Sequence, residues 1–256
     1  MQLTLSDIRV RHGRNEILRL DRLHLSGDEL TVVLGHNGSG KSTLMQLLAR
    51  QITPQQGQVR LNDRPLADYS QKSLARQLAF LPQQLPPAAG LTVRELVRLG
   101  RFPWRGLLRP WGRDDRVIVE KAMAQTAVTP YADRLVDELS GGERQRVWIA
   151  MLLAQQSPLL LLDEPTSALD LSHQYECMTL LKDLNRTTGR GMLVILHDIN
   201  LAARYADRII ALRHGELAFD GSARELLSGP RLKALYGIDL HLLEQPGQPH
   251  PVAVVA

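Results

Sequence analysis

The segment GHNGSGKST, residues 35–43, is the feature that most constrains how this chain can fold. It matches the pattern G-x-x-x-x-G-K-[ST], whose glycines let the backbone turn tightly and direct N–H groups at phosphate oxygens. The segment ELTVVLG, residues 29–35, is a continuous β-branched run that ends in the first glycine of the motif, and helical spacing follows in KSTLMQLLARQ. A glycine-rich turn with an incidental lysine would not explain these flanks. The sequence therefore predicts a phosphate-binding loop between a buried strand and a helix.

The polar side chains of this loop have separate predicted roles. Lys41 is placed to reach the β- and γ-phosphates of a nucleotide, and the Ser42 hydroxyl can hold Mg²⁺. Thr43 adds a hydroxyl near the α-phosphate. The candidate ATP-binding residues are Gly35, His36, Asn37, Gly38, Ser39, Gly40, Lys41, Ser42 and Thr43.

A second motif, LLLLDEP at residues 159–165, ends an apolar run with two carboxylates. Asp163 is a candidate to hold Mg²⁺. Glu164 is a candidate to orient the attacking water and accept its proton, which nucleotide hydrolysis requires. The alternative is an acidic turn before Pro165, which would be credible without the first motif. Together the two motifs predict a nucleoside triphosphatase.

A further anion site is predicted in LSGGERQRVWIA, residues 139–150. Ser140, Gly141 and Gly142 stand directly before a run with helical character. Open backbone N–H groups and the positive end of a helix dipole favour a bound anion. The chain therefore has two sequence segments able to contact phosphate.

The remaining pattern alternates strands with helices and predicts an α/β fold. The expected nucleotide-binding core comprises residues 1–83 and 158–222, and residues 84–157 form an inserted helical subdomain. Within the insert, Thr92 followed by Glu95 predicts a capping box. Residues 223–256, which end in the Pro-rich stretch QPGQPHPVAVVA, are expected to be a C-terminal appendage.

Composition limits the function classes. The net charge is +4 and the pI is near 9.4, but Lys and Arg are scattered among Asp and Glu, so no nucleic-acid-binding arm is predicted. Cys177 is the single cysteine, which fits a reducing compartment. The first residues give no signal-peptide pattern. The longest apolar run, residues 147–154, is far shorter than the ~20 residues that span a bilayer.

The motifs GHNGSGKST, LPQ, LSGGE, LLLLDEP, SALD and LHD occur in the order and spacing of the ATP-binding-cassette (ABC) ATPases, which the chain resembles over nearly its whole length. The resemblance implies a P-loop cassette with a RecA-like core, an N-terminal antiparallel β subdomain and an inserted α-helical subdomain. It also implies ATP and Mg²⁺ as ligands. In this family two cassettes pack head to tail, and each LSGGQ-type signature closes over the nucleotide held by the facing subunit.

The resemblance gives roles to further residues. Gln83 matches the glutamine that joins Mg²⁺ and the attacking water; alone, it would be an ordinary polar residue at a strand end. Asp170 would bridge the two subunits. His197 matches the histidine that senses the γ-phosphate, although a lone histidine after a strand is more often structural. Ser140 and the two following glycines would contact the partner's ATP, and Glu143 stands where the family usually has Gln.

Two positions depart from the family pattern. His12 occupies the place where a tyrosine commonly stacks on adenine, so weaker stacking and looser base selectivity are expected. His36 stands where proline is common, and a side chain there is expected to point away from phosphate. His36 therefore should have little effect on nucleotide binding.

An ATPase of this group must act on another protein, and the resemblance implies a polytopic membrane permease. The subdomain segment 91–104 carries Phe102 and Trp104, which form either a socket for a partner helix or the core of the subdomain. Within the family the sequence is most similar to importer ATPases for iron(III)-siderophores, haem and cobalamin, especially the ferric-hydroxamate type. This implies a peripheral location on the cytoplasmic face of the bacterial inner membrane and a substrate-binding protein that supplies the permease.

Three other functions share part of this sequence pattern. Import of haem or cobalamin uses the same chemistry. A soluble ABC protein of DNA repair or translation generally has two cassettes or a long coiled-coil insertion, and this sequence has one motif set in 256 residues. A catalytically inactive interaction module conflicts with the intact Lys41, Asp163 and Glu164.

Overall fold

The larger β-sheet contains the apolar runs that the sequence predicts as buried strands. In the computed structural model, which describes residues 1–105, 110–247 and 249–255, six strands form this sheet. Their order across it is β10 (Glu216–Gly221), β9 (Arg208–Arg213), β3 (Leu30–Leu34), β8 (Gly191–Ile195), β7 (Leu159–Leu162) and β6 (Leu78–Leu81). All neighbouring pairs are parallel except β9 with β10. Every residue of β3, β7 and β8 is buried, as in sheets covered on both faces. The predicted α/β core is confirmed.

The smaller sheet is antiparallel and confirms the expected N-terminal β subdomain. Its order within the described chain is β2 (Asn15–Ser26), β1 (Gln2–His12), β4 (Gln56–Leu61) and β5 (Arg64–Pro65). Buried and accessible residues largely alternate along β1 and β2, because one face of this sheet packs on the core. Strand β2 was not among the strands predicted from the sequence.

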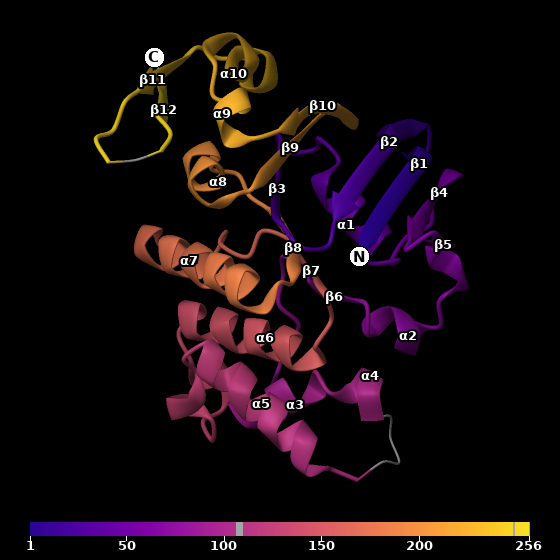
Figure 1. Cartoon of the computed structure of the whole chain (residues 1–256), viewed down its shortest axis with the longest axis vertical. Helices are drawn as coiled ribbons and strands as arrows, with labels where there is room; N and C mark the ends of the chain where they lie inside the picture. The colour runs from indigo at the N-terminus through magenta and orange to yellow at the C-terminus, as the bar shows by residue number, and fades with distance from the viewer. Residues whose placement is uncertain (106–109, 248, 256) are drawn as a thin grey trace.

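The helical subdomain is inserted between β6 and β7. Its described elements are α3 (Val93–Leu99), α4 (Phe102–Arg105), α5 (Arg113–Gln125), α6 (Gly141–Gln155) and the 3₁₀ turns η2 (Thr129–Tyr131) and η3 (Val136–Glu138). Figure 1 shows α3, α5 and α6 together at one end of the molecule. The predicted capping box is present, since the Thr92 side chain accepts from the Glu95 N–H and the Glu95 carboxylate accepts from the Thr92 N–H. Residues 106–109 of the predicted subdomain lie outside the described residues.

The other helices flank the larger sheet or follow it. They are α1 (Lys41–Leu48), α2 (Gln71–Ala75), α7 (Leu171–Thr188), α8 (Ile199–Tyr205), α9 (Ala223–Leu226), α10 (Gly229–Tyr236) and the 3₁₀ turn η1 (Leu66–Asp68). The C-terminal segment ends in a hairpin of β11 (Leu240–Leu243) and β12 (Val252–Val255), which was not predicted. Figure 1 shows this hairpin and α10 at the end opposite the helical subdomain. Residues 248 and 256 of this segment are not described.

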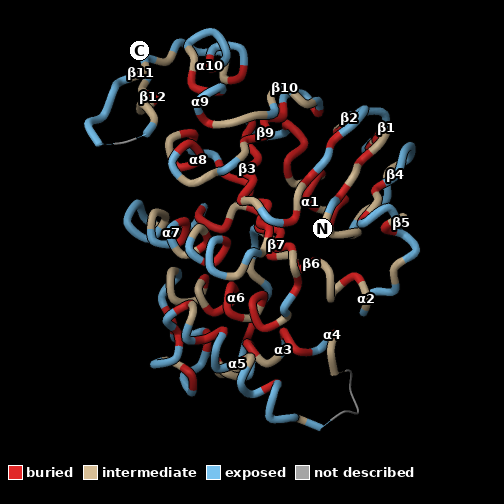
Figure 2. Tube along the Cα trace, in the orientation of Figure 1, coloured by how far each residue is buried: buried red, intermediate tan, exposed pale blue. Residues whose placement is uncertain are grey.

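Two hydrophobic cores lie on the two faces of the larger sheet. One contains α3, α5, α6, α7 and α8, and it includes Ala253 of β12. The other contains α1 and the inner face of the smaller sheet. Figure 2 shows the buried segments concentrated along the larger sheet and α6. Among the described residues, no helix combines the length and apolar character that crossing a membrane requires.

Candidate functional site

The predicted site residues follow the carboxyl ends of four parallel strands. The phosphate-binding loop follows β3, Gln83 follows β6, the two acidic residues of LLLLDEP follow β7, and His197 follows β8. These strands are neighbours in the larger sheet, so their carboxyl ends lie along one edge. Ligands of open α/β sheets bind at this edge. The fold therefore brings residues separated by more than 100 positions to one place.

The phosphate-binding loop needs glycine at two positions for identifiable reasons. Gly35 has φ 147° and Gly40 has φ 99°, both in the region that L side chains rarely adopt. A Cβ on Gly35 would lie 2.3 Å from the Leu212 carbonyl oxygen, and one on Gly40 would lie 3.0 Å from that of Ile17. The loop therefore fits tightly between neighbouring backbone segments, and α1 begins directly after it.

Lys41 is buried and folded back over this loop. Its Nζ donates to the carbonyl oxygens of Gly35 (2.7 Å) and His36 (3.0 Å). Burial lowers the pKa of Lys41, while the charges of Glu164 and Asp163 act in the opposite direction. The ammonium group is thus held within the loop that the sequence predicts to bind phosphate.

Ser42 and Asp163 place two oxygen atoms side by side. The Ser42 Oγ lies 3.5 Å from Asp163 Oδ1, and Asp163 is 5% exposed. Burial and then the charge of Glu164 raise the pKa of Asp163 to about 6. A hydroxyl and a desolvated carboxylate are the hard oxygen ligands that suit Mg²⁺, and a cation here would offset the cost of burying the charge. The residues present therefore fit a magnesium ion.

Glu164 lies between the two other predicted catalytic residues. Gln83 Nε2 donates to Glu164 Oε2 at 2.6 Å, and His197 Nε2 lies 2.6 Å from Glu164 Oε1. The Glu164 side chain is 10% exposed and that of His197 is 45% exposed. These contacts hold both carboxylate oxygens, so the orientation of Glu164 is fixed by groups from two other strand ends.

A cavity of about 450 Å³ joins these groups, and we call it the nucleotide cavity. Its lining residues are Ile17, Asn37, Gly38, Gly40, Lys41, Ser42, Thr43, Gln83, Glu164 and His197. Its volume lies within the usual range for small-molecule sites. Lysine, hydroxyl and carboxylate groups therefore share one open space of a size suited to a nucleotide.

The two histidines that depart from the family pattern lie away from this lining. His12 is exposed on β1, and Ile17 on the neighbouring strand lines the cavity instead. The His36 imidazole is turned to the C-terminal segment, where Nε2 donates to the Leu235 carbonyl oxygen at 2.9 Å. Ile17 was missed from the sequence because an isolated isoleucine in an alternating strand carries no functional signal.

The second anion site, residues 140–143, forms the start of α6. Ser140 is the N-cap residue, and its hydroxyl donates to Glu143 Oε2 at 2.8 Å. The same carboxylate accepts from the Ser140 N–H at 2.9 Å and from the Tyr131 hydroxyl. The Ser140 N–H, then the Ser140 and Tyr131 hydroxyls, lower the pKa of Glu143. Tyr131 lies on η2, and its contact with Glu143 was not predicted.

The glycines of this site differ in their surroundings. A Cβ on Gly141 would meet no described atom within 4 Å, so the backbone there is open. A Cβ on Gly142 would lie 3.0 Å from the ring of His173 on α7. None of residues 140–143 lines the described nucleotide cavity. The two predicted phosphate contacts of one chain are therefore separate surfaces.

Asp170 and its neighbour present an exposed surface at the start of α7. Asp170 caps this helix, accepting from the His173 N–H at 2.9 Å and lying 2.7 Å from His173 Nδ1. The His173 N–H is the main cause of the lowered pKa of Asp170. Leu171, the first residue of α7, is 68% exposed. This exposed apolar side chain was not singled out from the sequence.

The structure separates the two aromatic residues proposed as a partner socket. Phe102 is 58% exposed. Trp104 is half-buried, its indole N–H donates to the Gln155 carbonyl oxygen at 2.6 Å, and its ring packs under Arg76 and Arg101. Trp104 therefore belongs to the packing of the subdomain, and Phe102 belongs to its surface.

Comparison with known proteins identifies the family. The ABC transporter family model matches residues 18–167, which is more than half of the chain. The chain is 39% identical to the ferric enterobactin transport ATP-binding protein FepC of Escherichia coli, over 99% of this chain and 92% of that protein. It is 39% identical to the iron(3+)-hydroxamate import ATP-binding protein FhuC of Bacillus subtilis, over 98% and 94%. It is 36% identical to the hemin import ATP-binding protein HmuV of Shewanella denitrificans, over 98% and 100%.

Solved structures agree with the sequence comparison. A dimeric ATP-binding cassette in a post-hydrolysis state, bound to ADP and Pi, superimposes with a TM-score of 0.75. It is 31% identical, and the match covers 87% of this chain and 99% of that one. The nucleotide cavity, the fold and the relatives agree: the chain belongs to the ABC transporter family, as an ATP-binding subunit whose ATPase activity is coupled to transport.

Proposed function

We propose that this chain is the ATP-hydrolysing subunit of a bacterial importer that takes up an iron(III)-siderophore of the hydroxamate type through a separate permease. The observation that carries the catalytic part is the position of Glu164 between Gln83 and His197 at the edge of the nucleotide cavity. A carboxylate held at both oxygens can orient water and accept its proton. The relatives named above support the iron-importer part.

The residues of the cavity divide the work of ATP hydrolysis. The loop N–H groups and Lys41 bind the phosphates, and Lys41 exchanges its contacts with Gly35 and His36 for phosphate oxygens. Ser42, Asp163 and Gln83 would hold Mg²⁺, which when bound neutralises charge on the β- and γ-phosphates. Glu164 accepts the proton of the attacking water, and His197 holds the carboxylate in place.

We propose that two copies of the chain form the working ATPase. Residues 140–143 do not line the nucleotide cavity within the described chain, and the backbone at Gly141 is open. Bound to a facing copy, the Ser140 hydroxyl and the start of α6 would contact the γ-phosphate of that copy's ATP. Asp170 and the exposed Leu171 lie at a helix start that supports a contact between subunits. The proposed dimer is head to tail.

The permease would contact the exposed face of the helical subdomain. Here the guanidinium carbons of Arg98 and Arg105 each lie 4.2 Å from the centroid of the Trp111 ring. Leu99 is 53% exposed and Phe102 is 58% exposed beside a cavity of about 310 Å³. Apolar side chains with flanking cations suit a partner segment that carries apolar and acidic residues. A chain bound there would lie peripherally on the cytoplasmic face of the inner membrane.

A matched pair of variants tests this surface. Phe102→Ala removes an exposed side chain, so we expect less permease in pull-downs and unchanged basal ATP hydrolysis. Trp104→Ala removes a packed side chain, so we expect a lower melting temperature instead. Equal permease recovery with Phe102→Ala would argue for a different docking surface.

The substrate is tested by uptake. Cells lacking this protein would be supplied with labelled ferric hydroxamates, ferric catecholates, haem and cobalamin, and then complemented with the wild type or with Lys41→Ala. We expect loss of ferric-hydroxamate uptake that only the wild type restores. A selective defect in haem uptake would favour the second candidate, for which the similarity to HmuV is the specific observation. Recovery of ribosomes or DNA without a membrane partner would favour a soluble ABC protein.

A further inference from the structure

The C-terminal hairpin is tied to α8 by the side chain of one asparagine. Asn200 Nδ2 donates to the Ala253 carbonyl oxygen at 3.0 Å, and the Ala253 N–H donates to Asn200 Oδ1 at 2.8 Å. The amide thus satisfies both backbone groups of a residue 53 positions away. Two bonds of opposite direction fix the position and orientation of β12 against α8 more tightly than one bond would.

The asparagine lies three residues after the predicted γ-phosphate sensor. His197 contacts Glu164, and Asp198 then caps α8 by accepting from the N–H groups of Asn200 (2.7 Å) and Leu201 (3.1 Å). Helix α8 has only seven residues, so its position depends on tertiary contacts rather than on helix propensity. A contact that fixes the first turn of α8 therefore also fixes the segment that carries His197.

The same C-terminal segment also contacts the phosphate-binding loop. His36 donates to Leu235, and the His36 and Tyr236 rings meet edge to face with centroids 5.5 Å apart. Burial, and then the charge of Asp198, raise the pKa of Tyr236 to about 12, so this buried phenol lies within the field of the residue that caps α8. The segment therefore joins the two sides of the catalytic site, at the loop after β3 and at the start of α8.

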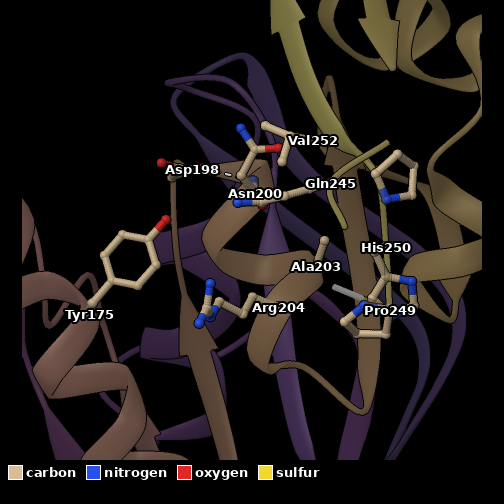
Figure 3. Close-up of a pocket in the computed structure, with 10 residues that line it drawn as sticks. Tyr175, Asp198, Asn200, Ala203, Arg204, Gln245, Pro249, His250 and Val252 are labelled. Carbon is tan, nitrogen blue, oxygen red and sulfur yellow. Dashed lines mark hydrogen bonds between the residues drawn. The ribbon is translucent and has the colours of Figure 1, made fainter. Parts of the chain in front are cut away.

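Packing around the hairpin leaves a cavity of about 140 Å³. In Figure 3, Asp198, Asn200 and Val252 lie together at one end of this cavity, while Tyr175 and Arg204 lie on the side of α7 and α8. Ala253 packs in the hydrophobic core, and among the described residues the cavity separates other parts of the hairpin from α8. The Asn200 amide is thus an important part of the contact between the hairpin and α8.

We propose that Asn200 is a positioning residue for ATP hydrolysis, which anchors α8 to the C-terminal hairpin and so holds His197 against Glu164. The inference rests on the roles proposed for Glu164 and His197. Asn200 does not line the nucleotide cavity, so it acts through His197 and not on ATP. It gives the C-terminal segment a function in the reaction.

The test compares Asn200→Ala with a matched control elsewhere in the chain. Asn185 also joins backbone segments through its side-chain amide, with Nδ2 donating to the carbonyl oxygens of Asp28 (3.0 Å) and Arg190 (2.8 Å). It lies near the end of α7, beside the segment that precedes β3 and away from the carboxyl ends of the strands. Asn185→Ala should lower the melting temperature and leave kcat unchanged.

For Asn200→Ala we expect kcat to fall about tenfold to a hundredfold, because small misplacements of catalytic groups lower the rate by such factors. The KM for ATP should change by less than about twofold. The isosteric Asn200→Asp keeps the acceptor for the Ala253 N–H and loses the donor, so its kcat should be intermediate. The new carboxylate also faces the Ala253 carbonyl oxygen, which lowers the stability of the folded protein. The kcat values are therefore compared under conditions of equal protein stability, where that of Asn200→Asp should be intermediate.

A double-mutant cycle separates positioning from general stabilisation. If Asn200 acts through His197, Asn200→Ala should cause no further loss of kcat in a His197→Ala background. Multiplied losses in the cycle, or a wild-type kcat for folded Asn200→Ala, would overturn the inference. Absence of ATP hydrolysis by the wild type would instead contradict the proposed function, so the two failures are distinguishable.

Discussion

Glu164, the proposed catalytic base, has a strained backbone. Its φ is 50°, in the left-handed region that glutamate rarely adopts, which costs on the order of 1–3 kcal/mol. The surrounding chain fixes this conformation: the Asp163 N–H donates to the Leu81 carbonyl oxygen at 2.9 Å, and the Ser167 N–H and hydroxyl donate to the Glu164 carbonyl oxygen. In this conformation the Glu164 carboxylate contacts Gln83 and His197.

Replacing Glu164 by glutamine should stop turnover and preserve nucleotide binding. Glutamine has the same shape but cannot accept the proton of water, so we expect kcat to fall by about 10²–10⁴-fold. ATP affinity should stay near that of the wild type, because Lys41 and the loop are unchanged. Steady-state hydrolysis and equilibrium ATP binding measure the two effects. Hydrolysis at the wild-type rate would remove Glu164 from the role of base.

The raised pKa of Asp163 predicts a pH-dependent stability. Because its pKa is about 6 in the folded chain and 3.8 in the reference state, the folded chain binds the proton more tightly, and stability is lost as the pH rises through 6. The Asp163→Asn variant has no carboxyl group at this position, so it does not lose stability in this way as the pH rises. The melting temperature of Asp163→Asn minus that of the wild type should therefore increase from pH 4.5 to pH 7.5, measured in EDTA without nucleotide.

Asp170→Asn is the control for this measurement. The pKa of Asp170 is lowered by the His173 N–H, so its stabilising contribution is present above the usual aspartate pKa and is lost only in acid. The difference between Asp170→Asn and the wild type should not grow between pH 5 and pH 7.5. A flat difference for Asp163→Asn as well would show that its carboxylate titrates at an ordinary pH.

At the level of elements, strong local patterns made most of the core predictable. The apolar runs of β3, β7 and β8 are continuous because helices or another sheet cover both faces, and such runs are distinctive. The capping box of α3 is a local pattern of four residues, so it could be predicted directly from the sequence. Strand β12 was not predicted, because it is defined by pairing with β11 and by the contact with α8. Such non-local contacts leave little trace in a Pro-rich segment.

The candidate site shows the same division. Lys41, Asp163 and Glu164 could be predicted as site residues because the chemistry of phosphate groups fixes residue type and spacing, and Lys41 and Glu164 line one cavity. Ile17 and Tyr131 were missed because their neighbours at the site come from elsewhere in the chain. Hydrophobic and hydroxyl contacts of this kind require the fold before they can be recognised.

The start of α6 gives a prediction at the element scale. The Glu143 carboxylate competes for the hydroxyl proton of Ser140 and adds negative charge where the partner's γ-phosphate is proposed to bind. Glutamine keeps the capping box and removes the charge. Glu143→Gln should therefore strengthen ATP-dependent dimerisation by about two- to fivefold at low ionic strength, the scale of a charge at a helix start. Sedimentation at increasing salt measures this, and an effect that salt does not diminish would argue against charge as the cause.

At the scale of the whole molecule, the sheet and the insert place the two predicted phosphate contacts on different parts of the chain. The nucleotide cavity lies at the carboxyl edge of the larger sheet, and the start of α6 belongs to the subdomain inserted between β6 and β7. The loop lies against the backbone of Leu212 and Ile17, and α6 packs in one of the two hydrophobic cores. A second copy of the chain is then the simplest way to place the start of α6 against the nucleotide bound by a phosphate-binding loop.

Mixing two inactive variants tests this arrangement. Lys41→Ala removes phosphate binding, and Gly141→Asp adds a carboxylate at an open position where it opposes a phosphate without disturbing the start of α6. Each variant alone should be inactive. In a mixed dimer, the Gly141→Asp subunit's loop faces an intact signature, so an equal mixture should recover about a quarter of the wild-type sites if pairing is random. If both contacts served the ATP of their own chain, no mixture would recover activity, and the assay of ATP hydrolysis against mixing ratio would stay at the baseline.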